Sequence, residues 1–159
     1  MMRLRVDNAP LKNLTSLVDS DLFEIRPTDF EHFSTETRRS HPLKVWLTVG
    51  SAYRNLQSKA DGLSIVVLAS DHLSMHTAMI NYANLGRTEE FQVGGSLCHN
   101  VTFHCVDDID SLGWFLYESE CHIISNGRHL TECRMFDLQG RLLLTSVQEG
   151  YVTKRNEQH

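Results

Sequence analysis

The longest apolar segment of the chain is DGLSIVVLASDHLSM, residues 61–75, and it continues as far as Gly86. Apolar or small residues recur in this segment at helical spacing and occupy more than one face. They include Leu63, Val66, Val67, Ser70, Ser74 and Ala78. Such a pattern is typical of a helix that packs on several sides. We expect Asp61 to cap the N-terminus of this helix and Gly86 to end it.

One carboxylate, Asp71, lies near the middle of the expected helix. We expect its side chain to be buried, and an ionised carboxylate in a protein interior is costly unless it has hydrogen-bond partners. The rest of the chain should therefore supply those partners. Together with His72 and His76, Asp71 also argues against a membrane-spanning helix.

The composition limits the classes of function. The chain has 159 residues, which suits one domain or one half of a symmetric assembly. A formal net charge of -5 offers no basic surface for nucleic acid. The four cysteines form no Cys-x-x-Cys pair and we recognise no secretory signal. We therefore expect reduced, mostly structural thiols in an intracellular protein.

Short segments rich in apolar residues predict strands on both sides of the helix. Before the helix we expect strands at 23–26 and 43–49. After it we expect a polar loop from Arg87 to Gly95, closed by the Gly94-Gly95 pair, and then four strands. Their expected ranges are 96–105, 114–125, 128–138 and 142–153. This order predicts an α+β fold in which the helix lies against a curved antiparallel sheet.

Two dipeptides predict tight turns between the later strands. Asn-Gly at 126–127 and Gln-Gly at 139–140 both fit two-residue hairpin turns. We expect residues 1–20 to form an N-terminal linker with a short helix, and residues 21–155 to form the folded domain.

The last expected strand is apolar on both faces, since Leu143, Val147 and Tyr151 alternate with Leu144 and Val152. An antiparallel sheet with one face in water alternates more cleanly than this. We therefore expect a second sheet or a second subunit to cover its outer face.

Several short motifs of this chain resemble those of the type II acyl-CoA thioesterases. They are Phe-Glu-Ile-Arg-Pro at 23–27, Val-Trp at 45–46, Ala-Ser-Asp at 69–71, Phe-His at 103–104 and Ser-Val-Gln-Glu-Gly at 146–150. The resemblance covers roughly residues 22–154, and Val-Gln-Glu-Gly is its most specific part. It implies a hot-dog fold, in which an antiparallel sheet wraps a long central helix. The enzymes of this family contain two hot dogs, and the chain resembles the C-terminal one.

The resemblance also implies a catalytic site. In the family an Asp, a Thr and a Gln hold the attacking water, and these positions match Asp71, Ser96 and Gln148. Water attack on a thioester carbonyl needs a base and neutral groups that orient the water, which these side chains can supply. The family's Asp-His-Ser-Met-Trp-Phe-His segment is Cys-His-Asn-Val-Thr-Phe-His here, at 98–104. Loss of the Asp and the Trp bears on acyl-chain preference and rate.

The resemblance further implies an acyl-CoA substrate, a role in fatty acid and lipid metabolism, and neither a cofactor nor a metal. Because the chain contains one hot dog, we expect a homodimer that forms a double hot dog. We expect a cytoplasmic or peroxisomal location, although the C-terminus is not a tripeptide of the Ser-Lys-Leu type. The alternative function is a non-catalytic hot-dog module that binds acyl-CoA or supports a catalytic half. A hydratase is less favoured, because no Asp-x-x-x-x-His spacing marks the helix start.

Other polar clusters have simpler interpretations. His72 and His76 could form half of a metal site, but no third ligand has suitable spacing, so we expect ordinary helix residues. Alternation along a strand separates Cys98 and His104 from His99 and Cys105. We expect a solvated turn at the acidic residues 107–110 and a surface loop at the arginines 38–39.

Overall fold

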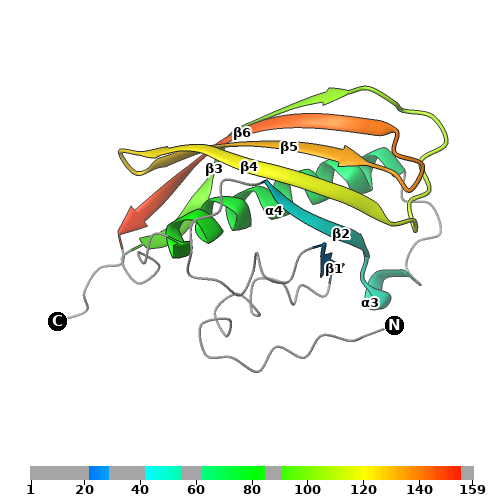
Figure 1. The fold of residues 1–159 in the computed structure, drawn as a ribbon, viewed down its shortest axis with the longest axis horizontal. Coiled ribbons are helices and arrows are strands. Elements are labelled where there is room, and N and C mark those ends of the chain that lie inside the picture. Colours follow the sequence, from blue (N-terminus) through cyan, green and yellow to red (C-terminus); the bar gives the residue numbers. More distant parts are fainter. Residues whose placement is uncertain (1–21, 29–41, 55–61, 85–90, 155–159) are drawn as a thin grey trace.

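The computed structural model describes residues 22–28, 42–54, 62–84 and 91–154 (Figure 1). The expected linker at 1–20, both expected helix-end residues, Asp61 and Gly86, and the arginines at 38–39 lie outside these residues.

Six antiparallel strands form one sheet in the order β1-β2-β4-β5-β6-β3. The strands are β1 (Phe23–Pro27), β2 (Leu43–Val49), β3 (Phe91–Phe103), β4 (Phe115–Ser125), β5 (Arg128–Phe136) and β6 (Leu142–Lys154). The helices are α3 (Ser51–Arg54), which the sequence did not predict, and α4 (Gly62–Asn84). The sheet curves around α4, which lies against one of its faces (Figure 1). The predicted α+β layout is confirmed.

The core lies between α4 and the sheet. Val66, Ala69 and Leu73 recur at helical spacing and are no more than 4% exposed. They belong to one cluster with strand residues such as Leu47 and Met135, which are fully buried. Burial of each large apolar side chain contributes about 1.5–3 kcal/mol. This packing fixes the rotation of α4 about its axis and so decides which helix residues face β3. Among the described residues, no helix combines the length and apolar character needed to cross a membrane.

The Gly94-Gly95 pair does not close a loop, as the sequence predicted, but lies inside β3. A Cβ atom on Gly94 would overlap the ring of Tyr151 on β6, so glycine is required here by a close approach between strands. The pairing of β3 with β6 shifts register between Val93 and Gly95 and again between Ser96 and Cys98. β3 is therefore a long edge strand with two irregularities next to each other.

The two expected hairpin turns have different outcomes. Asn126 and Gly127 both have positive φ, 52° and 72°, which confirms the predicted two-residue turn. The Gln139-Gly140 prediction is wrong in length, because the pairing of β5 with β6 ends at Phe136 and Leu142. The connection spans residues 137–141, and Gly140 alone has a positive φ, 77°.

The carboxylate of Asp137 organises this longer connection. It accepts hydrogen bonds from the backbone N of Gln139 and of Arg141, both at 2.9 Å, and from Arg141 Nε at 2.6 Å. Burial acts to raise the pKa of Asp137, but the hydrogen bonds and charge of Arg141 outweigh it and hold the pKa below its ordinary value.

The outer face of β6 is partly as expected. Val147 and Tyr151 are 41% and 40% exposed, so two of the three apolar residues lie uncovered on the single chain. Leu143 is instead 1% exposed, because it packs into the core, and its carbonyl accepts a hydrogen bond from His104 N at 2.9 Å. The expectation that Leu143 needs an outside cover is therefore wrong.

Candidate active site

Three polar side chains from three elements meet at one point beside α4. Ser96 on β3 donates its hydroxyl hydrogen to Asp71 Oδ1 on α4 at 3.3 Å. Gln148 on β6 donates from Nε2 to the same Asp71 oxygen at 2.7 Å and to Ser96 Oγ at 2.5 Å. The structure thus brings together all three residues that the sequence indicated, in a closed triangle of hydrogen bonds.

The irregular pairing of β3 explains how Ser96 reaches this triangle. Ser96 lies opposite Gly150 and His99 lies opposite Gln148, both of which are on the helix-facing side of β6. Residues three apart in a regular strand point to opposite faces. The extra residue between Ser96 and Cys98 restores the alternation, so that both Ser96 and His99 face α4.

Gly150, opposite Ser96, also has a reason to be glycine. A Cβ atom there would overlap the buried ring of His129, whose Nε2 approaches the sulfur of Met75 at 3.0 Å. Burial lowers the pKa of His129, so a neutral ring is favoured in this position.

The expectation that Asp71 is buried is wrong, since its side chain is exposed in the single chain. Its neighbours Ala69 and Ser70 are fully buried and face the sheet, which turns Asp71 toward the edge where the sheet ends at β3. The expected partners are nevertheless present. Both hydrogen bonds go to Oδ1, and Oδ2 has no hydrogen-bond partner among the described residues.

The hydrogens of the triangle can be assigned completely. Gln148 uses its two Nε2 hydrogens for Asp71 and Ser96, and Ser96 uses its one hydrogen for Asp71. Gln148 is 1% exposed, and its Oε1 is buried without a partner in the described part of the chain. Of the two unpaired acceptors, Asp71 Oδ2 belongs to an exposed side chain that lines the cavity and is available to a water molecule or a substrate, whereas Gln148 Oε1 is closed off by burial.

Two buried hydroxyl groups connect the helix and the sheet next to the triangle. Ser74 lies one helical turn after Asp71, and its Oγ is 2.5 Å from Thr131 Oγ1 on β5. Thr131 Oγ1 in turn donates to the carbonyl of Gln148 at 3.4 Å. Ser74 and Thr131 are both buried, so this chain of contacts ties α4 to the strand that carries Gln148.

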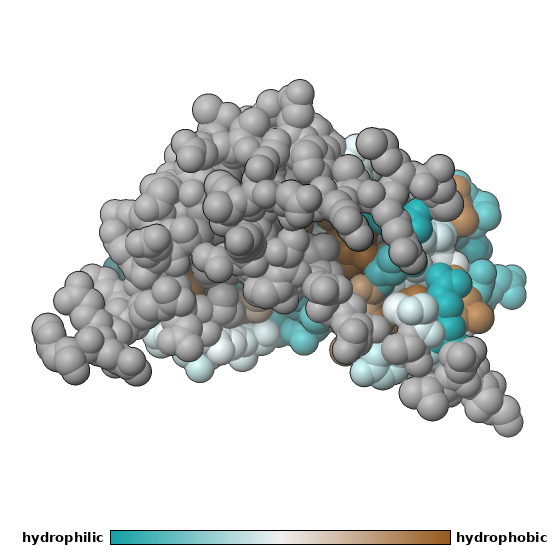
Figure 2. All heavy atoms as spheres, turned by 90° about the horizontal axis from the view of Figure 1, so that it is seen from below, coloured by the Kyte–Doolittle hydropathy of each residue, from teal (hydrophilic) through white to brown (hydrophobic). Residues whose placement is uncertain are grey.

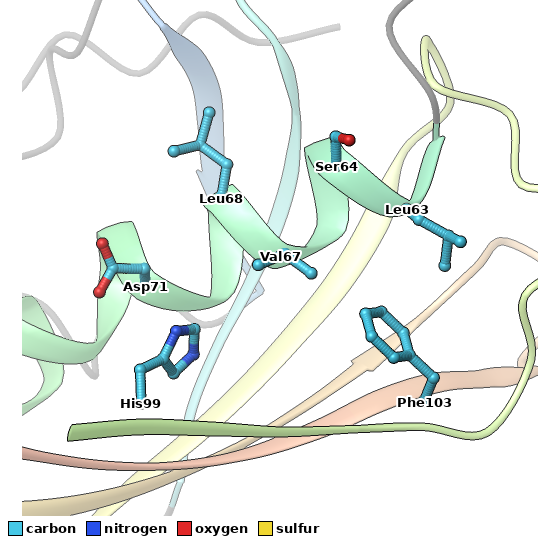
Figure 3. A pocket seen from close by; sticks show the side chains of 7 residues that line it. All are labelled: Leu63, Ser64, Val67, Leu68, Asp71, His99 and Phe103. Atoms are coloured by element: carbon cyan, nitrogen blue, oxygen red, sulfur yellow. The ribbon is translucent and has the colours of Figure 1, made fainter.

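A cavity of about 590 Å³ lies next to the triangle, between α4 and β3 (Figure 3). The side chains that line it are Leu63, Ser64, Val67, Leu68, Asp71, His99 and Phe103. Leu68 and Phe103 are 42% and 44% exposed, so the cavity opens onto apolar surface. In Figure 2, which views the molecule from below, hydrophobic and hydrophilic residues lie side by side in the coloured part of the surface. Cavities lined by apolar side chains with few polar groups are typical of sites for small ligands.

A family model described as "Acyl-CoA thioesterase C-terminal domain" matches residues 4–152. The chain belongs to the acyl-CoA thioesterase family. The resemblance to type II thioesterases that the sequence motifs indicated is thereby confirmed. No curated protein matches the chain.

Solved thioesterase structures share the fold. Acyl-CoA thioesterase II TesB2 from Mycobacterium marinum has a TM-score of 0.63 and 22% identity over 87% of this chain and 52% of its own. A thioesterase from Haemophilus influenzae has a TM-score of 0.60 and 14% identity over 94% of both chains. A hypothetical thioesterase from Streptococcus pneumoniae, solved with coenzyme A, has a TM-score of 0.53 and 14% identity over 92% of this chain and 99% of its own.

These likenesses show the fold alone, and they confirm the predicted hot-dog fold of an acyl-CoA thioesterase domain. The chain spans about half the length of the Mycobacterium marinum protein, at 52% of it.

The other candidate clusters have structural roles in this thioesterase domain. His76 Nδ1 lies 2.8 Å from the His72 carbonyl, and the His72 ring packs 5.5 Å from the ring of Phe23. Burial, with a smaller effect of His76, lowers the pKa of His72. Within the described ranges, no three His, Cys, Asp or Glu side chains are placed to hold a metal ion.

At the start of the segment 98–105, Cys98 and His99 lie on opposite faces of the strand, as alternation predicts. Cys98 is exposed, His99 faces the cavity, and His104 Nε2 lies 3.0 Å from Thr145 Oγ1 on β6. All four cysteines are free, and burial raises the pKa of Cys133 to about 11, so that its thiol stays protonated. Sequence reasoning considered His99 only as a metal ligand and missed its place beside Asp71. The signal that could have found it is the His that the family segment and this chain share.

Proposed function

We propose that this chain is a catalytic domain that hydrolyses fatty acyl-CoA to free fatty acid and coenzyme A. The observation that carries the proposal is the Asp71–Ser96–Gln148 triangle beside an apolar cavity. Thioester hydrolysis needs a base, groups that orient water and a place for the acyl chain, and this site has candidates for each. Membership in the acyl-CoA thioesterase family supports the same chemistry.

Asp71 acts as the base in the proposed reaction. Its Oδ2 accepts a proton from water while the water oxygen bonds to the thioester carbonyl carbon. Ser96 and Gln148 hold Oδ1, which fixes the plane of the carboxylate. Through these two hydrogen bonds Ser96 and Gln148 set the direction in which Oδ2 meets the water. The C–S bond then breaks, and its electron pair leaves with the sulfur of coenzyme A.

The apolar part of the cavity would take the acyl chain. Leu63 and Val67 extend along α4 from Asp71, and Phe103 faces them from β3 (Figure 3). Because a helix rises 1.5 Å per residue, the distance along α4 from Asp71 to Leu63 is about 12 Å. A medium-length acyl chain would fit along this path. Such a reaction would belong to fatty acid metabolism. The cytoplasmic or peroxisomal location of the protein stays a prediction from the sequence.

The active form in this proposal is a homodimer with two α4 helices side by side. β3 is an edge strand of 13 residues, and a long unpaired edge is a template for another strand. Leu68, Leu97 and Phe103 lie near this edge and are 42%, 49% and 44% exposed. A second copy would cover them, close the cavity and remove Asp71 from bulk water. Light scattering tests this, and a particle near 18.2 kDa that keeps full thioesterase activity would exclude the dimer.

The decisive test separates catalysis from binding. We would measure release of free coenzyme A from acyl-CoA substrates of increasing chain length, and acyl-CoA binding by calorimetry under the same conditions. Hydrolysis that depends on chain length supports the proposal. Binding without turnover at any chain length would contradict it and identify the alternative, a non-catalytic acyl-CoA-binding module.

A further inference from the structure

His99 shares the cavity with Asp71 but has no role in the reaction described so far. It rises from β3 toward α4 below Asp71 (Figure 3), and both side chains line the cavity. It lies opposite Gln148 in the pairing of β3 with β6. A second group that can carry a proton is therefore next to the residues that would activate the water.

The hydrogen bonds of Ser70 decide which ring nitrogen of His99 faces the helix. Ser70 Oγ donates its only hydrogen to the carbonyl of Val67 at 2.8 Å. His99 Nε2 lies 3.2 Å from the same Oγ, which can then only accept. Nε2 must therefore carry a hydrogen. Because Ser70 is fully buried, this contact holds the ring from the closed side of the site.

Nδ1 is then the nitrogen that is available for chemistry. It has no hydrogen-bond partner in the described ranges, and it is not among their buried unpaired atoms, so it is accessible on a side chain that lines the cavity. Nε2 carries a hydrogen in both the neutral and the protonated ring. The contact with Ser70 therefore survives when Nδ1 gains or loses a proton, and the ring need not rotate.

We propose that His99 is a further catalytic residue, the general acid that protonates the sulfur of the departing coenzyme A. The inference rests on the proposed thioesterase function and adds the second half of its proton transfer. It assigns different roles to the two groups that face each other across the cavity, with Asp71 acting on the water and His99 acting on the leaving group.

The step balances as follows in atoms and charge. Asp71 takes one proton from water, and the remaining hydroxide oxygen bonds to the carbonyl carbon. As the C–S bond breaks, its electron pair goes to sulfur, and Nδ1 of protonated His99 donates its proton there. The products are a carboxylic acid and a thiol, which leaves His99 neutral and Asp71 protonated. Transfer of that proton from Asp71 to His99 through water restores both groups.

A comparison of leaving groups tests the role of His99. Thiolates of more acidic thiols leave faster and need less help from a general acid. We would compare an acyl-CoA with the same acyl group on thiophenol, for wild type and for His99→Gln, whose amide can still donate to Ser70. A general acid contributes at least about 100-fold, so His99→Gln should lose that much kcat with acyl-CoA. With the thiophenol ester it should lose less than about tenfold.

Two further variants control the experiment. His104→Gln changes an exposed histidine that follows β3. In the described part of the chain its side chain hydrogen-bonds only Thr145, so the variant should behave as wild type with both esters. Ser70→Ala removes the group that orients His99 and should show the same leaving-group dependence at smaller amplitude.

The outcomes distinguish failure of the His99 proposal from failure of the thioesterase function. Equal losses with both esters in folded His99→Gln, or no loss, would overturn the role of His99 and leave the thioesterase function standing. A wild-type protein that hydrolyses neither ester would overturn both proposals. A His99→Gln variant that fails to fold leaves the decision to Ser70→Ala, where equal loss with both esters would again contradict general acid catalysis.

Discussion

Replacement of Asp71 by Asn tests the centre of the proposed site with little change in shape. In the wild-type chain Oδ1 accepts two hydrogen bonds, from Ser96 and Gln148. The Asn carbonyl oxygen can keep both of these bonds, and its amide nitrogen then takes the place of Oδ2. That nitrogen carries two hydrogens and cannot accept one from water. The variant therefore keeps the triangle and loses the base.

The Asp71→Asn change should affect kcat strongly and stability weakly. Loss of a positioned general base lowers kcat by about 100- to 10,000-fold. A hydrogen bond to a charged acceptor contributes about 1 kcal/mol more to stability than one to a neutral acceptor. Asp71 accepts two such bonds and is exposed, so Asp71→Asn should lower the free energy of unfolding by less than about 2 kcal/mol. KM should change little, because the apolar lining of the cavity is untouched.

The assay is steady-state release of free coenzyme A, with thermal unfolding measured on the same samples. Asp107→Asn is the matched control, because Asp107 is exposed and its side chain has no hydrogen bond or ion pair among the described residues. A folded Asp71→Asn protein whose kcat stays within about threefold of wild type would refute the assignment of the base.

Three further outcomes follow from particular contacts. Gln148→Ala and Ser96→Ala should each reduce kcat about ten- to thousandfold. The double variant should lose less than the product of the two losses, because both side chains hold one carboxylate, and multiplicative losses would argue against a shared role. Ser96→Thr should be tolerated. Gly94→Ala should lower the free energy of unfolding by about 1–3 kcal/mol, since the added methyl group overlaps Tyr151, and chemical denaturation would show it. Asp137→Asn should destabilise the protein at neutral pH by about 1 kcal/mol and weaken its loss of stability in acid; an unchanged acid transition would contradict this.

The sign of the Asp137 prediction comes from linkage. The pKa of Asp137 is below its ordinary value of 3.8 in the folded chain, because the hydrogen bonds and charge of Arg141 outweigh the opposing effect of burial. The folded state therefore binds this proton less readily than the unfolded state does. The stabilisation is complete above the ordinary pKa and is lost as the pH falls through the lower pKa of the folded chain.

Local sequence patterns were enough to predict most elements of the fold. α4 is recognisable because its apolar residues recur at helical spacing over 23 residues. The turn at Asn126 and Gly127 is recognisable because that dipeptide tolerates positive φ at both positions. The Gly94-Gly95 pair misled the prediction, because the reason for glycine there is the ring of Tyr151, more than fifty residues away in the sequence.

The sequence could point to the residues of the candidate site, but not to their geometry. The motifs pointed to Asp71, Ser96 and Gln148, and the structure places these three within hydrogen-bonding distance. Spacing alone would put Ser96 and His99 on opposite faces of β3, and only the observed register shift shows that they share one. The exposure of Asp71 was equally hidden, since it depends on where the sheet ends beside α4.

The exposure of Asp71 and the open edge of β3 are connected through the chemistry. A carboxylate in bulk water is surrounded by solvent that competes for its proton and weakens every electrostatic contact around it. The triangle holds Asp71 Oδ1, but in the single chain Asp71 is exposed, and the neighbouring Leu68 and Phe103 are 42% and 44% exposed. A second copy paired along β3 would cover the charged base and the apolar surface in one step. In our proposal the same contact that removes an aggregation-prone edge therefore also completes the surroundings of the base.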